Sequence, residues 1–286
     1  DPEYLTVWAH EVHPEALAGV RFQHALRLPE GSPAYESVRS DAFHLPQSLS
    51  EHAEGLSFDW LLSSSQNLVC LYASESLTME FDSPNAYPFA IKVAIGGIDC
   101  LSGEEDGGTL SRTPQNYIPL PCQNWLDAWQ NTEGETMQFL PPPVGPPDDD
   151  GVPPPREDEM DRISVTFVPM KASAFERHAD NLDLNAGRPV YGTEDFPLRF
   201  QESTMLNGRM KYEMEKGAEW DAGMVYPDPF EPDDWELGQA QAVSVTMVRP
   251  AAWTKITKEP PPGPHFERQI YEDAGVPGFE RYADES

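Results

Sequence analysis

Apolar and polar residues alternate with a period of two along much of this chain, and this pattern restricts the folds it can adopt. Clear examples are VRFQHALRL at 20–28, LTMEF at 77–81, AIKVAI at 90–95, ISVTFV at 163–168 and VSVTMV at 243–248. Successive side chains of a β-strand point to opposite faces, so each segment predicts one buried face. Valine, threonine and aromatic residues at these positions favour strands over helices.

Helical signals are few. The segments 171–181 and 266–275 favour short helices, and the second reaches Gly275, a residue type common just after a helix. Asn207-Gly208 predicts a hairpin over 198–215, with Met205 opposite Met210. Many strands with few helices predict a mainly β protein built of antiparallel, sandwich-like units.

A proline-rich segment suggests how the chain is divided. PPPVGPPDDDGVPPP at 141–155 holds eight prolines, which lack the amide donor that a central strand needs. We therefore expect a β-rich unit at 1–140, a linker or loop at 141–160, a second β-rich unit at 161–258 and a proline-rich C-terminal segment at 259–286 with a short helix. The alternative is a single large sandwich that carries a long proline loop.

The charge limits the possible partners. The chain has 19 basic and 49 acidic residues, a net charge of −30, divided equally between residues 1–143 and 144–286. Such a surface repels phosphate, so we expect no nucleic-acid binding and no insertion into an anionic membrane. The acidity can serve solubility alone, or it can attract divalent cations or a basic partner.

Targeting signals and cysteine chemistry give little further direction. The longest apolar text, FAIKVAIGG at 89–97, is too short to span a bilayer and contains Lys92. No signal peptide is visible, and a start at Asp1 indicates processing or trimming, so we expect a soluble protein of undetermined location. Cys70, Cys100 and Cys122 fit no zinc or CxxC spacing and predict buried free thiols, or one disulfide with one free thiol.

The chain lacks the common catalytic motifs GxSxG, HExxH, GxxxxGK[ST] and GxGxxG. His10 and His13 in HEVH would share a face on a helix, but their context predicts a strand and a turn. Asp183 opens a fragment of a calcium loop that lacks the late bidentate glutamate. These three residues are lesser metal candidates, and calcium is the one cofactor considered. His24 falls on the apolar face of its strand, which predicts a hydrogen-bonded, semi-buried histidine.

The stretch NYIPLPCQNWLDAWQN at 116–131 holds the main candidate site. Trp125 and Trp129 stand four residues apart, so on one helical turn they would share a face and close a core or an interface. The other interpretation is a ligand platform in which the two rings stack on a sugar, with hydrogen bonds from Gln123, Asn124 and Asp127.

Several motifs resemble those of a microbial protein family without an assigned activity. A segment GGIDCLSGE at 96–104 is followed by Y-x-x-x-P-x-Q-x-WLD and by QF, and the chain ends in PPP-x-P and Y-x-x-x-G-x-P-x-F-x-x-Y. The resemblance covers about residues 90–286, with Ala128 where glycine is usual. The family pattern is rich in aromatic residues, proline and glycine, which is more typical of a scaffold than of a catalytic site. The matching residues are Gly96, Gly97, Asp99, Ser102, Gly103, Glu104, Tyr117, Pro121, Gln123, Trp125, Leu126, Asp127, Gly134, Gln138, Phe139, Pro260, Pro261, Pro262, Pro264, Tyr271, Gly275, Pro277, Phe279, Tyr282 and Glu285.

Three functions are therefore open. The first is a non-enzymatic, β-rich scaffold or interaction protein that binds itself or another protein and can self-assemble into a homo-oligomer or filament. The second is a carbohydrate-binding module that uses Trp125 and Trp129. The third is a hydrolase with two opposed carboxylates, although 49 acidic residues give the sequence no means of selecting the pair.

Overall fold

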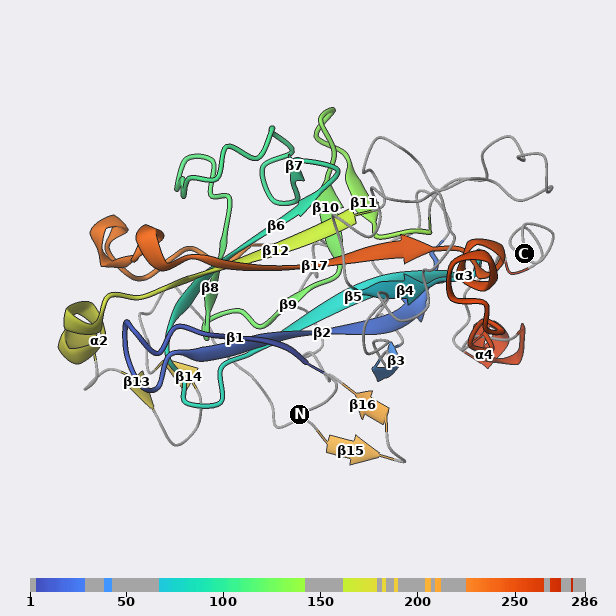
Figure 1. The fold of residues 1–286 in the computed structure, drawn as a ribbon, viewed down its shortest axis with the longest axis horizontal. Helices are drawn as coiled ribbons and strands as arrows, with labels where there is room; N and C mark the ends of the chain where they lie inside the picture. Colours follow the sequence, from blue (N-terminus) through green and yellow to red (C-terminus); the bar gives the residue numbers. More distant parts are fainter. Residues whose placement is uncertain are drawn as a thin grey trace.

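The computed structural model describes residues 4–28, 39–42, 67–141, 162–178, 225–264 and 268–273, with the short pieces 182–183, 188–189, 204–206, 209–211 and residue 279. Within these residues the protein is mainly β, as the alternation predicts. Two sheets of mostly antiparallel strands pack in a sandwich-like arrangement, and the helices are short. Figure 1 shows β1, β2 and β5 running below β6, β12 and β17.

The first sheet has the strand order β1-β2-β5-β9, and β3 also pairs with β2. Its pairings are antiparallel, and β2 and β5 pair along eight residues, from Gly19 opposite Asp82 to Leu26 opposite Glu75. This long register explains why the alternation is clear in both segments. The strands are β1 (Leu5–Trp8), β2 (Leu17–Leu26), β3 (Arg39–Ala42), β5 (Glu75–Asp82) and β9 (Trp125–Leu126).

The second sheet has the order β4-β17-β12-β6-β7, and β8 also pairs with β6. Its pairings are antiparallel except for the parallel pair of β17 and β4. Two strands with similar text, ISVTFV and VSVTMV, are neighbours here, with Ser164 opposite Ser244. The strands are β4 (Leu68–Cys70), β6 (Phe89–Ile95), β7 (Ile98–Asp99), β8 (Ile118–Leu120), β12 (Arg162–Pro169) and β17 (Gln241–Val248).

The second sheet joins residues from both sides of the predicted linker at 141–160, of which only residue 141 lies in the described part. β6 precedes the segment and β12 follows it, yet they pair from Ile163 opposite Ile95 to Pro169 opposite Phe89. The predicted units 1–140 and 161–258 therefore share a sheet and a core.

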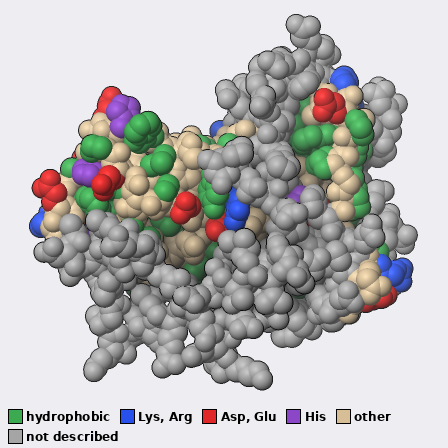
Figure 2. All heavy atoms as spheres, turned by 90° about the horizontal axis from the view of Figure 1, so that it is seen from below, with side chains coloured by type: hydrophobic (Ala, Val, Ile, Leu, Met, Phe, Trp, Pro, Cys, Tyr) green, Lys and Arg blue, Asp and Glu red, His purple; other side chains and the backbone are tan. Residues whose placement is uncertain are grey.

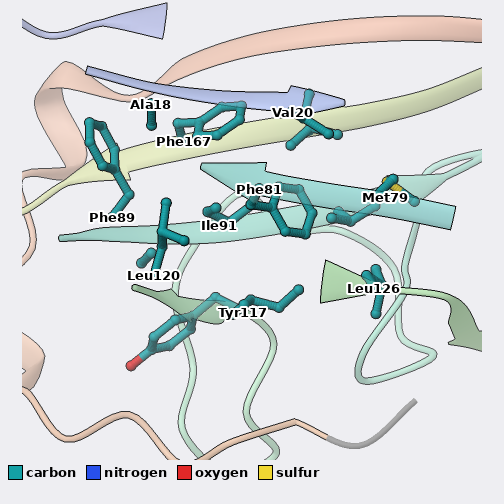
Figure 3. Close-up of a cluster of buried hydrophobic side chains, with 14 of the residues drawn as sticks. Ala18, Val20, Met79, Phe81, Phe89, Ile91, Tyr117, Leu120, Leu126 and Phe167 are labelled. Atoms are coloured by element: carbon teal, nitrogen blue, oxygen red, sulfur yellow. The ribbon is translucent and has the colours of Figure 1, made fainter. Parts of the chain in front are cut away.

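One hydrophobic cluster lies between the two sheets (Figure 3). Burying a side chain of this size contributes roughly 1.5–3 kcal/mol, so the cluster is the main source of stability. The face of each strand that alternation marked as apolar supplies it. Members from the first sheet are Val20, Phe22, Leu77, Met79, Phe81 and Leu126, and members from the second are Phe89, Ile91, Val93, Ile163, Val165, Phe167, Val245 and Met247.

Three small ribbons accompany the sandwich. They are β10 (Ala128–Gln130) with β11 (Thr136–Gln138), β13 (Leu182–Asp183) with β14 (Arg188–Pro189), and β15 (Thr204–Leu206) with β16 (Arg209–Lys211). The last ribbon places Met205 opposite Met210, which confirms the predicted hairpin register. Residues 207–208 of its turn lie outside the described part.

The helices are α2 (Ala172–His178), α3 (Pro250–Thr257) and α4 (Arg268–Asp273), with 3-10 turns η3 (Pro232–Asp234) and η4 (Leu237–Gln239). The first and last confirm the two predicted helices. The sequence interpretation missed α3, which begins with Pro250, a favourable first residue, and packs Trp253 and Ile256 against β4 and β17. None of the described helices has the length and apolar character needed to cross a bilayer.

Candidate functional site

The stretch 116–131 forms strands, so the predicted helical turn at Trp125–Trp129 is wrong. Trp125 lies in β9 opposite Glu80, and Trp129 lies in β10 opposite Met137. The spacing of four was compatible with a helix, but pairing with strands distant in sequence decides the conformation here.

The two tryptophans also have different environments. The half-buried Trp129 packs against the main core, and its Nε1 donates to the carbonyl oxygen of Gln138 over 3.2 Å. The half-buried Trp125 meets the ring of Tyr226 edge-on, with centroids 5.5 Å apart and planes at 88°. Among the described rings, Trp125 therefore pairs with Tyr226 and not with Trp129.

The polar residues of the predicted site fasten the chain. Gln123 is 1% exposed, accepts the backbone N–H of Tyr226 over 2.8 Å and donates to the carbonyl oxygen of Trp125 over 3.0 Å. The carbonyl oxygen of Asn124 accepts the N–H of Phe81 over 2.9 Å. Asp127 is 8% exposed and follows directly after β9. Gln123 and the backbone of Asn124 thus place Trp125 beside Tyr226 and β5.

A buried carboxylate, Asp228, lies two residues after Tyr226 in the same segment. The Asp228 side chain has no exposed surface, and its Oδ2 accepts hydrogen bonds from the hydroxyl of Tyr117 and, over 3.0 Å, from Nε1 of Trp235. The guanidinium of Arg112 lies 3.1 Å from the same oxygen. Oδ1 of Asp228 accepts the N–H of Phe230 over 2.9 Å. These five residues form the Asp228 network.

The Asp228 network clamps residues 225–235 to β8 and the loop before it. Gln115 adds a second link, because it donates to the carbonyl oxygen of Tyr226 over 2.8 Å and accepts the N–H of Asp228 over 3.1 Å. Burial and the hydrogen bond to Asp228 raise the pKa of Tyr117 to about 12, although Arg112 opposes the shift. Sequence reasoning missed Asp228, and the only signal was the aromatic residues within the acidic loop YPDPFEPDDW.

Trp125 belongs to a cluster of polar and aromatic side chains on the outer face of the first sheet. Cross-strand pairing sets Arg21 opposite Glu80 and Glu80 opposite Trp125, and in the next row Gln23 opposite Thr78. We call these five residues the outer-face array. Directly opposed side chains lie about 5 Å apart.

The two rows of the outer-face array differ in their hydrogen bonding. In the first row, Arg21 donates to Glu80 over 2.5 Å. In the second, Gln23 is 6% and Thr78 1% exposed, yet Oε1 of Gln23 and Oγ1 of Thr78 have no hydrogen-bond partner. A buried polar oxygen without a partner costs about 1–3 kcal/mol, and such groups are uncommon.

A second surface lies where α2, η4 and the 9–16 turn meet, at the left of Figures 1 and 2. Trp8 is 59% exposed at the end of β1, and Leu237 is 51% exposed in η4. Nε2 of Gln241, the first residue of β17, donates to the carbonyl oxygen of Trp8 over 3.1 Å and so links the end of β1 to the start of β17, which follows η4 in the chain. With the exposed His10 and Glu11, Trp8 and Leu237 form the α2-end surface.

Figure 2 shows hydrophobic, histidine and acidic side chains close together at this end. The ring of His10 lies 5.6 Å from that of Trp8, and His13 stacks on Tyr87 with centroids 5.1 Å apart. In the described part of the chain, no three His, Cys, Asp or Glu side chains gather where they could hold a metal ion. Asp183 lies in β13.

Two histidines pair with buried carboxylates. His24 is 2% exposed, and its Nδ1 lies 3.1 Å from Oε2 of Glu75, which confirms the predicted hydrogen-bonded histidine. His178 lies 3.0 Å from Oδ2 of Asp234, and Arg177 binds Oδ1. Burial would raise the pKa of Asp234, but hydrogen bonds from His178, the N–H of Glu231 and Arg177 lower it below its ordinary value.

The three cysteines are free and buried, as the first of the two sequence interpretations has it. Burial raises the pKa of Cys70 and of Cys122 to about 12, and it raises the pKa of Cys100 well above the ordinary thiol value. All three thiols therefore stay protonated near neutral pH, and the protonated form is not the nucleophile.

Comparisons with protein-family models, with curated proteins and with solved structures found no match to this chain.

Proposed function

We propose that this protein is a non-enzymatic interaction protein that docks a basic partner protein on the α2-end surface. The observation that carries the proposal is Trp8, whose side chain is 59% exposed although its strand is fully paired with β2. Tryptophan is enriched among the residues that dominate binding energy at protein interfaces.

The backbone that presents Trp8 is fixed before any partner arrives. Its four-residue strand pairs at every position with β2, from Leu5 opposite Val20 to Trp8 opposite Leu17. Gln241 binds its carbonyl oxygen, and His10 meets its ring edge-on at 65°. A partner therefore loses little affinity to the ordering of this surface.

Charge selects the kind of partner. The net charge of −30 attracts basic proteins over a distance, and Glu11 is exposed beside Trp8. Two copies of the chain repel one another for the same reason, so we propose a different protein as the partner. The expected partner segment has an apolar side chain flanked by lysine or arginine.

Buried ionisable groups support a binding role over a catalytic one. Glu75 accepts both His24 and the N–H of Tyr72, Asp234 joins α2 to η3, and Asp228 clamps residues 225–235. Each of these carboxylates accepts hydrogen bonds that link different segments of the chain.

The test is selection of short peptides from a displayed random library on the wild-type protein, with binding then measured by calorimetry. We expect enriched peptides with an aromatic or aliphatic residue between basic residues. Trp8→Ala should weaken their binding about tenfold or more, as for an interface hot spot. Raising the salt concentration should weaken it further, because opposite charges attract the peptide.

Met137→Ala is the matched control, since Met137 on β11 is also a large hydrophobic residue above a third exposed but does not belong to the α2-end surface. Peptides that bind Trp8→Ala as tightly as the wild type would contradict the proposal. So would sedimentation of the protein as an oligomer or filament at low ionic strength, which would return self-assembly as the better hypothesis.

A further inference from the structure

We infer that the outer-face array is a separate binding site for a polyhydroxylated ligand, namely a carbohydrate. It lies on the same sheet face as Trp8 but beyond the start of β1, where Arg21 lies over the ring of Tyr4 with 5.2 Å between its Cζ and the centroid. Trp8 is four residues further along, about 13 Å at 3.3 Å per residue. The inference is therefore independent of the docking function proposed above.

The first observation is chemical composition. A sugar offers hydroxyl groups around its rim and C–H groups on its faces, so it needs donors and acceptors beside an aromatic surface. The first row supplies the Trp125 ring, the carboxylate of Glu80 and the guanidinium of Arg21. The second supplies the amide of Gln23 and the hydroxyl of Thr78.

The second observation is the pair of buried oxygens without a partner. Gln23 Oε1 and Thr78 Oγ1 stand on directly opposed residues, so both lie in one small region of the face. Each oxygen can accept a hydrogen bond from a hydroxyl group, and the Thr78 hydroxyl can also donate one. Ligand hydroxyl groups that reach this row would supply the missing hydrogen bonds.

Accessibility gives the ligand an orientation. The first row reaches solvent, since Trp125 is half-buried and the Arg21 side chain is 15% exposed, whereas the second row is almost closed. A sugar face would therefore stack on Trp125, with hydroxyl groups directed along the strands toward Thr78 and Gln23. Gln115 and Gln123 support this arrangement, because both bind the backbone of Tyr226, whose ring meets that of Trp125 edge-on.

The test uses a panel of neutral oligosaccharides of glucose, galactose, mannose and N-acetylglucosamine, with tryptophan fluorescence for detection and calorimetry for affinity. We expect at least one to bind the wild type. Trp125→Ala should abolish detectable binding, and Thr78→Val should weaken it about tenfold, as for the loss of one hydrogen bond in a desolvated site.

Thr246→Val is the matched control. Thr246 is also 1% exposed with an unpartnered Oγ1, but it lies in β17 of the other sheet. It should leave affinity unchanged, as should Trp8→Ala. A wild-type protein that binds no member of the panel would overturn the inference. Binding that survives in both Trp125→Ala and Thr78→Val, or that falls equally in Thr246→Val, would overturn it as well.

Discussion

The Asp228 network and the outer-face array both consist of polar and aromatic side chains that are largely buried, but they differ in whether their buried polar atoms have hydrogen-bond partners. Both Asp228 carboxylate oxygens accept hydrogen bonds, and four groups converge on them: Tyr117, Trp235, Arg112 and the N–H of Phe230. In the array, two oxygens that are equally buried have no partner.

This difference separates polar groups that stabilise the fold from polar groups that are available to a ligand. A satisfied buried network contributes rigidity and is strongly damaged by the loss of one member. An unsatisfied buried group destabilises the ligand-free protein and gains a hydrogen bond only when something binds. Composition alone does not distinguish the two, because both regions combine a carboxylate, an arginine and aromatic rings.

The largest expected effect is therefore at Asp228. Asp228→Ala should lower the free energy of unfolding by about 3–5 kcal/mol, because it leaves the Arg112 charge and the donors of Tyr117 and Trp235 without their acceptor. Denaturant unfolding monitored by circular dichroism measures the change. The exposed Asp233 of the same segment is the control, and its alanine variant should stay within about 0.5 kcal/mol of the wild type.

A loss at Asp228 below about 1 kcal/mol would show that the network contributes little, and the comparison with the array would fail.

The sequence predicts those features of the fold that leave a local pattern, and it does not predict those that depend on contacts between distant segments. Alternation predicts β2, β5, β6, β12 and β17, because burial of one face leaves a local pattern. It does not predict that β12 pairs with β6 across the 141–160 segment, since pairing partners leave no local pattern. Asp228 and Asp234 were likewise two acids among 49, and only contacts with distant segments distinguish them.

The same division applies to the residues of the candidate site. Trp125 stands out by residue type, but the sequence leaves open whether it closes a core or interface or serves as a ligand platform. Its partner Tyr226 lies 101 positions away, and the array residues Arg21, Gln23, Thr78 and Glu80 reach it only through strand register. Trp129, which looked equivalent in sequence, contributes to the core instead.

The second largest effect concerns Asp234, which resembles Asp228 but has partners nearer to solvent. Asp234→Asn should cost about 1–3 kcal/mol at pH 7, because the amide cannot accept from His178, Arg177 and the N–H of Glu231 together. The Arg177 side chain is 57% exposed, so its share of that cost is the smallest.

The stability difference between the wild type and Asp234→Asn should decrease as the pH falls. The pKa of Asp234 is lowered in the folded protein, so its stabilisation is fully present above the unfolded carboxyl pKa of about 4 and is lost as the pH falls through the lower folded value. The stability gap between wild type and Asp234→Asn should be steady from pH 7 to about 5 and shrink below pH 4. Urea unfolding at several pH values measures it, and a gap that grows on acidification would contradict the assignment.

The smallest expected effect tests the array itself through stability. Thr78→Val replaces a buried hydroxyl that has no partner with a methyl group, so the free energy of unfolding should stay within about 0.5 kcal/mol of the wild type or rise. Thr257 is the contrasting case, since it is 4% exposed and its Oγ1 donates to the carbonyl oxygen of Trp253 over 2.9 Å and accepts the N–H of Glu259 over 3.1 Å. Thr257→Val should cost about 1–2 kcal/mol in the same unfolding measurement. If Thr78→Val proved as costly as Thr257→Val, its hydroxyl would have a structural partner, and the two regions would no longer differ in the way that singles out the array as a ligand site.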